Sequence, residues 1–219
     1  MSMILHSYYR SSAAYRVRIA LNLKGLDYAY IAHHLRHNAH LAPDYRALNP
    51  QAFVPALEID GNVLAQSLAI TEYLDEAHPS PPLLPAAPID RAYVRSLAQI
   101  IACDIHPVDN LRVLRYLRQP LGHAEPEIEA WYNHWIAEGF AALELILSAD
   151  QRTGVYCFGD TPTLADIFLV PQMLNARNYN LDLSQYPTLV RINSACLALE
   201  AFARAHPSLQ PDAEPVSGR

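Results

Sequence analysis

Residues 54–67 read VPALEIDGNVLAQS, and this stretch decides the predicted fold of the first part of the chain. Two short runs of strand-forming residues flank Asp60-Gly61-Asn62, a combination typical of a tight hairpin turn. Pro55 has no N–H to give to a strand ladder, so it belongs at a strand entrance or edge, where tight turns also favour a cis peptide bond. Ser67 then opens a helix with apolar residues on one face.

The residues before this hairpin alternate between strand and helix patterns. Residues 3–8 and 28–32 are rich in strand formers, and an amphipathic helix follows Ser11-Ser12 and stops at Gly25. The polar stretch 33–47 predicts an irregular helix. The predicted order over residues 1–80 is therefore β-α-β-α-β-β-α.

Five prolines fall among residues 79–88, a composition that resists regular structure and is typical of a stiff linker. We place the linker at residues 81–88. Beyond it, helical periodicity covers roughly residues 90–116, 125–147, 163–178 and 187–205, and residues 207–219 resemble a loose tail. The sequence thus predicts an α/β domain over residues 1–80 and an all-α domain over residues 89–219.

The composition narrows the possible functions of this 219-residue chain. With 22 acidic and 16 basic side chains its net charge is −6, so it lacks the global positive field that collects nucleic acid or an acidic membrane. Its three cysteines form no CxxC pair, which argues against a disulfide framework, a zinc site or a dithiol redox motif. No secretory signal and no run of about 18 apolar residues is found, so we expect a cytoplasmic protein without a metal.

Three positions in the first domain have the chemistry to bind a peptide. Ser11 and Ser12 lie where a strand feeds a helix, and there unpaired N–H groups and a hydroxyl would stabilise a thiolate. Gln66-Ser67 is a similar junction that suits a carboxylate, and the backbone at Val54-Pro55 could pair with an extended tripeptide. Taken singly, each of these positions has a simpler interpretation: the serines as helix caps and Val54-Pro55 as an ordinary turn.

Together these elements resemble the glutathione transferase superfamily, whose fold is a thioredoxin-like N-terminal domain followed by an all-helical domain. The stretch RSSAAYRVRIAL at residues 10–21 is similar to the SSCxWRVRIAL pattern of the zeta class. Asn49-Pro50-Gln51 and FGDTPTLAD at residues 158–166 match further landmarks, so the resemblance covers nearly the whole chain.

The resemblance implies glutathione as the cofactor and assigns roles to individual residues. Ser11 would hold the glutathione thiolate, and Arg10 and Arg177 would bind the carboxylates and developing charge of the substrate. For each arginine a solvated surface charge or a structural ion pair is the alternative. The residues expected to contact glutathione are Ser11, Ser12, His40, Gln51, Val54, Pro55, Gln66, Ser67, His106, Asn110 and Arg112.

The resemblance further implies a homodimeric cis-trans isomerase of a maleyl-type diacid, acting in the breakdown of aromatic compounds. Ala13 stands where the zeta pattern has cysteine, which weakens the match to maleylacetoacetate isomerases that use that thiol and favours the related maleylpyruvate isomerases. Two alternatives stay open: a transferase or dehalogenase acting on small electrophilic acids, and a non-catalytic glutathione-binding protein. The sequence does not choose between the diacids.

Overall fold

A computed structural model describes residues 3–214 and divides the chain into two compact units. The first comprises Met1–Pro82 together with Leu199–Arg219, and the second comprises Leu83–Ala198. The first break falls close to the predicted linker. The second was not expected: the predicted helical domain ran unbroken to residue 219, whereas the structure returns the chain to the first unit at Leu199.

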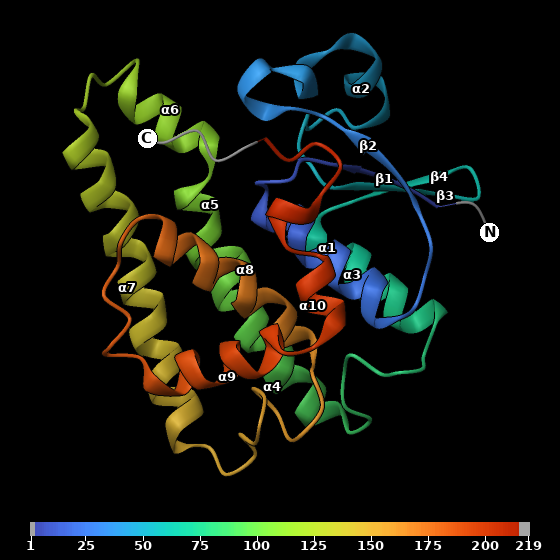
Figure 1. Ribbon diagram of the computed structural model, residues 1–219, viewed down its shortest axis with the longest axis vertical. Helices are drawn as coiled ribbons and strands as arrows, with labels where there is room; N and C mark the ends of the chain where they lie inside the picture. Colours follow the sequence, from blue (N-terminus) through green and yellow to red (C-terminus); the bar gives the residue numbers. More distant parts are fainter. Residues whose placement is uncertain (1–2, 215–219) are drawn as a thin grey trace. The chain divides into compact units, whose positions relative to one another are not determined.

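The first unit is built on a four-stranded mixed sheet with the order β2-β1-β3-β4 (Figure 1). Its strands are β1 (Met3–Ser7), β2 (Ala29–Ala32), β3 (Ala56–Ile59) and β4 (Asn62–Ala65). Leu5 of β1 is opposite Tyr30 in the parallel β2 and opposite Leu57 in the antiparallel β3. The predicted hairpin is confirmed, and Gly61 in its turn has a φ of +80°, a conformation that glycine adopts without steric cost.

Helices cover both faces of this sheet. Figure 1 shows α2 (Pro43–Leu48) on one side, with α1 (Ser12–Leu23), α3 (Ser67–Ala77) and α10 (Glu200–Arg204) on the other. The predicted irregular helix over residues 33–47 is shorter and broken: two 3-10 turns, Leu35–His37 and Ala39–Leu41, precede α2. They are separated at Asn38, whose φ of +58° is incompatible with a continuous helix.

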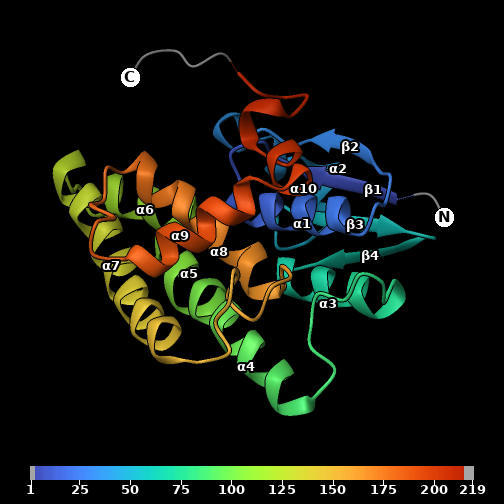
Figure 2. The ribbon, with the colours of Figure 1, turned by 60° about the horizontal axis from the view of Figure 1, so that its bottom comes forward.

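Apart from one isolated bridge between Thr153 and Gly159, the regular secondary structure of the second unit is helical in the described part of the chain. Its helices are α4 (Pro88–Gln99), α5 (His106–Asp109), α6 (Leu111–Arg118), α7 (Glu125–Ala149), α8 (Leu164–Asn178) and α9 (Pro187–Leu197). In Figure 2, α8 runs through the middle of this group, and most of its side chains are buried. None of the helices described is long and apolar enough to cross a membrane.

Two predicted helices of the second domain are interrupted. The expected helix over residues 90–116 widens into a π-helical segment at Ile100–Ile105 and breaks again at Asn110, where ψ is 160°. Pro107 lies just after the π-helical segment and lacks the N–H that would continue a regular ladder. The expected helix over residues 187–205 ends at Leu197, because Leu199 is extended, and a new helix starts in the first unit.

Candidate functional site

Ser11 lies at the junction between β1 and α1, as the sequence predicted. A turn from Tyr8 to Ser11 is closed by the Ser11 N–H, which donates to the Tyr8 carbonyl at 3.0 Å. The half-buried Ser11 hydroxyl accepts from the Ala14 N–H at 3.2 Å and so caps α1. A hydroxyl also carries one hydrogen of its own, so Ser11 can cap the helix and still donate to a thiolate. The two interpretations of this residue are therefore compatible.

Arg10 and Ser12 flank Ser11 and differ in exposure. Arg10 is exposed, whereas Ser12, the first residue of α1, is buried. The N-terminal turn of a helix presents N–H groups and the positive end of the helix dipole. The N-terminus of α1 and the exposed Arg10, the residue before Ser11, thus both bring positive charge to this junction. An anionic sulfur is stabilised by such surroundings.

Val54 and Pro55 are buried and joined by a cis peptide bond. They precede β3, whose pairing begins at Ala56, so the backbone of Val54 lies beyond the ladder formed by β1, β3 and β4. The Phe53 carbonyl before them accepts from the Tyr45 hydroxyl at 2.5 Å and the Asn49 amide at 2.9 Å. Side chains therefore fix this loop, and the Val54 backbone is placed to pair with an extended peptide.

Gln66 and Ser67 form the junction between β4 and α3. Gln66 has a φ of +72°, and its amide donates to the Gln51 side-chain oxygen at 2.9 Å, which joins two predicted cofactor residues. Ser67 is the first residue of α3, and its hydroxyl accepts from Arg16 Nη1 at 3.2 Å. Sequence reasoning missed Arg16, a guanidinium only 1% exposed. Its charge adds to the dipole of α3 in attracting a carboxylate.

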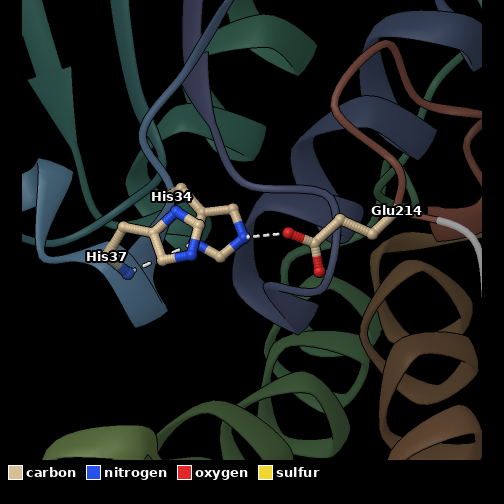
Figure 3. A group of neighbouring side chains, drawn as sticks. All are labelled: His34, His37 and Glu214. Carbon is tan, nitrogen blue, oxygen red and sulfur yellow. Dashed lines mark hydrogen bonds and ion pairs between the residues drawn. The ribbon is translucent and has the colours of Figure 1, made fainter. Parts of the chain in front are cut away.

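His40 lies in the 3-10 turn Ala39–Leu41, in a stretch of the first unit with four histidines. Three side chains of this unit, His34, His37 and Glu214, have possible metal-ligand atoms within 4.8 Å of one another (Figure 3). However, His34 Nδ1 accepts the His37 backbone N–H, so Nε2 carries the proton and donates to Glu214 at 2.9 Å. This group is therefore better described as a hydrogen-bonded contact than as a metal centre.

The remaining predicted site residues belong to the second unit. His106 begins α5, and the side chain of Asn110 caps α6 by accepting from the N–H groups of Arg112 and Val113. Arg177 is exposed in the last turn of α8. In the amide orientation that satisfies both groups, the buried Asn193 oxygen accepts from both Nη atoms of Arg177, at 3.0 and 3.2 Å. An amide orients the guanidinium without neutralising its charge.

Asp109 is a further feature that sequence reasoning missed. Its carboxyl is 5% exposed, lies between the predicted residues His106 and Asn110, and neither oxygen has a hydrogen-bond partner in the structure. Burial raises the pKa of Asp109 from 3.8 to about 8. At neutral pH this group is thus a protonated acid. An Asp at the end of a four-residue helix carries no sequence signal of such burial.

Comparisons with known proteins agree with this geometry. The glutathione S-transferase N-terminal domain family matches residues 5–82, and the C-terminal domain family matches residues 129–209. A maleylpyruvate isomerase from Ralstonia is 50% identical, over 96% of this chain and 99% of its own. The fold also matches a holo structure of maleyl pyruvate isomerase, a zeta-class bacterial glutathione transferase, with a TM-score of 0.95, 50% identity, and coverage of 96% of this chain and 100% of that one.

A maleylacetoacetate isomerase from Anaeromyxobacter dehalogenans, solved with glutathione bound in its active site, has a TM-score of 0.87 and 45% identity, with 97% of this chain and 98% of that chain covered. The likeness thus extends to isomerases of both diacids. It spans both units, and the two matched domain families occur in the predicted order. The chain therefore belongs to the glutathione S-transferase family, and it is an enzyme of that family's zeta class.

Proposed function

We propose that this enzyme uses glutathione to convert the cis double bond of a maleyl-type diacid into the trans form. The observation that carries the proposal is the similarity to isomerases of maleylpyruvate and maleylacetoacetate. It covers nearly the whole chain, with 45–50% of the aligned residues identical. The residues present fit the cofactor, and all of them belong to one unit. Ser11 offers a hydroxyl that can donate to a thiolate, and Val54 offers backbone groups outside the strand ladder. Gln66-Ser67 offers a site for a carboxylate.

Glutathione would supply a thiolate that adds reversibly to the double bond, allows rotation about the resulting single bond, and leaves again. Ser11 would donate a hydrogen bond to that thiolate and favour its ionised form. Ser67, with the Arg16 guanidinium behind it, would bind the γ-glutamyl carboxylate, and the Val54 backbone would hold the cysteinyl part. Arg10 and Arg177 would offset the charge that develops on the substrate.

Ala13 supports glutathione as the nucleophile. The cysteine of the zeta pattern is missing there, and the chain's three cysteines, all free thiols, belong to the second unit. Cys157 and Cys196 are buried, and burial raises the pKa of both thiols, which suppresses their reactivity. Because Ala13 replaces the cysteine that maleylacetoacetate isomerases use, we favour maleylpyruvate over maleylacetoacetate as the substrate.

An absorbance assay tests this proposal. Purified protein is mixed with maleylpyruvate or maleylacetoacetate, with and without glutathione. We expect isomerisation only with glutathione, and faster with maleylpyruvate. No reaction of either diacid would refute the proposal, and release of chloride from a chlorinated acid instead would favour a dehalogenase. Homodimer formation and a cytoplasmic location stay predictions; light scattering in solution measures the first.

A further inference from the structure

The turn that carries Arg10 and Ser11 is held by side chains from outside it. Within the turn, the one bond described is that from the Ser11 N–H to the Tyr8 carbonyl. The Tyr9 N–H donates to Asp212 Oδ2 at 3.0 Å, and the Tyr9 carbonyl accepts from Arg18 Nη2 at 3.1 Å. Both polar groups of the Tyr9 backbone are thus bound by charged groups, one of them about 200 positions away in the sequence.

Arg18 connects this turn to the body of the first unit. The side chain is fully buried, and it also donates to the Ser7 hydroxyl at 3.2 Å and to the Ala205 carbonyl at 3.1 Å. A guanidinium has five N–H donors in a rigid planar arrangement. The three bonds of Arg18 therefore fix the end of β1, the turn and the C-terminal segment, residues 205–214, relative to one another.

Asp212 holds the Tyr9 peptide from the other side. We call Arg18 and Asp212, with the Tyr9 peptide between them, the clamp. Its second oxygen, Oδ1, accepts from the Tyr30 hydroxyl of β2 at 2.6 Å. The opposite charges of Asp212 and Arg18 attract each other, which opposes the lowering of the Arg18 pKa by burial. A carboxylate on one side of the Tyr9 peptide and a guanidinium on the other therefore hold it with charge-assisted hydrogen bonds, a kind that is stronger than a bond between neutral groups.

A second anchor, at Glu214, keeps the C-terminal segment in place. One oxygen of Glu214 accepts from His34 Nε2 at 2.9 Å, and the other accepts from the Tyr9 hydroxyl at 3.4 Å. Figure 3 shows Glu214 reaching from the C-terminal segment toward His34 and His37. Ala213 packs on the apolar cluster of Tyr8, Tyr9, Tyr45 and Val54, which includes the predicted cofactor residue Val54.

We propose that Asp212, acting with Arg18 through the Tyr9 backbone, is a positioning residue that sets the place of Ser11 and Arg10 at the glutathione thiol. The C-terminal segment is then part of the thiolate site although it contributes no group to the cofactor. This inference rests on the proposed function. A misplacement of about 1 Å in a reacting geometry can lower a rate by about a hundredfold, so a loosened turn is costly.

The substitution that tests the clamp is Asp212→Ala, which removes both of its hydrogen bonds. Asp212→Asn is the conservative partner: its oxygen can accept from the Tyr9 N–H while its amide donates to the Tyr30 hydroxyl, an acceptor as well as a donor. Glu214→Ala is the matched control, because it removes the second anchor of the same segment and leaves the contact between Asp212 and Tyr9.

The readout is the pKa of the bound glutathione thiol, titrated by the ultraviolet absorbance of the thiolate without any diacid, together with kcat/KM. In Asp212→Ala we expect a higher thiol pKa and a loss of about ten- to a hundredfold in kcat/KM. Asp212→Asn and Glu214→Ala should stay within about threefold of the native enzyme. Melting curves identify any variant that does not fold, and Asp212→Ser, whose hydroxyl stops short of the Tyr9 N–H, then replaces Asp212→Ala.

Three outcomes overturn the clamp: an unchanged thiol titration in Asp212→Ala, an equal change in Glu214→Ala, or an Asp212→Asn variant as impaired as the alanine. All three are read against a native enzyme that binds and ionises glutathione. A native protein that binds no glutathione in calorimetry overturns the proposed function and the clamp together, whereas a native protein that ionises glutathione but isomerises no diacid refutes the proposed function alone.

Discussion

Asp109→Asn should be more stable than the native protein, by a margin that grows as the pH rises from 5 to 7. Asp109 is buried without a hydrogen-bond partner, and its pKa rises from 3.8 to about 8 in the folded protein. Between pH 5 and 7 the folded chain therefore keeps a proton that the unfolded chain has lost. Because the native state binds more protons, the free energy of unfolding falls as pH increases, by up to about 1.4 kcal/mol per pH unit from this group.

Over two pH units the contribution amounts to about 3 kcal/mol, a large share of the stability of an ordinary domain. Asparagine has nearly the shape of the protonated acid and does not ionise. The difference in unfolding free energy between Asp109→Asn and the native protein should therefore grow by about that amount from pH 5 to pH 7, in favour of the variant.

Urea denaturation at pH 5, 6 and 7 measures this difference. Tryptophan fluorescence is a suitable signal, because Trp131 donates to the carbonyl of Val108, next to Asp109. Asp104→Asn, which changes an exposed carboxylate nearby, is the control and should follow the native pH profile. Parallel profiles for the native protein and Asp109→Asn would refute the reasoning, because they would mean that Asp109 titrates alike in the folded and unfolded chains.

Three further substitutions test other parts of the structure. Ser11→Ala should raise the pKa of bound glutathione and slow turnover, while Ser11→Thr, which keeps the hydroxyl, should retain activity; equal thiol titrations in both would remove Ser11 from its role. Arg177→Ala should raise KM for the diacid about tenfold or more and leave glutathione affinity unchanged, as calorimetry can check. Gly139→Ala would bring a Cβ within 2.3 Å of the Ile105 side chain and should cost about 1–3 kcal/mol in urea denaturation. Ile105→Ala removes both atoms that the new Cβ would meet, so its own cost should be smaller in the Gly139→Ala variant than in the native protein, and equal costs would place the strain elsewhere.

The sequence predicted the elements whose signals are local. The Asp60-Gly61-Asn62 turn and the serine cap before α1 each act within a few residues, and the structure contains the corresponding hairpin and cap. The thioredoxin-like and all-helical halves are confirmed by the matched domain families. The roles of the individual site residues stay predictions.

The features that the sequence did not predict depend on contacts between distant positions. Residues 187–205 have continuous helical periodicity, yet the chain leaves the second unit at Leu199 because Ala201 and Ala205 bind Asn22 and Arg18 of α1. Nothing near Arg18 or Asp212 in the sequence indicates that they share the Tyr9 peptide. The burial of Asp109 likewise depends on packing between α5 and α7, which no short pattern encodes.

Helix α1 carries two buried arginines, Arg16 and Arg18, which reach opposite ends of the proposed cofactor site. Arg16 donates to the Ser67 hydroxyl, at the end proposed to bind the carboxylate, and Arg18 donates to the Tyr9 carbonyl, in the turn proposed to hold the thiol. Because both arginines belong to one helix, α1 sets the distance between the two ends of the proposed site. Substitutions that shift α1 should change glutathione affinity and thiol acidity together, so redesign of this enzyme for a shorter or longer thiol cofactor has to begin with the packing of that helix.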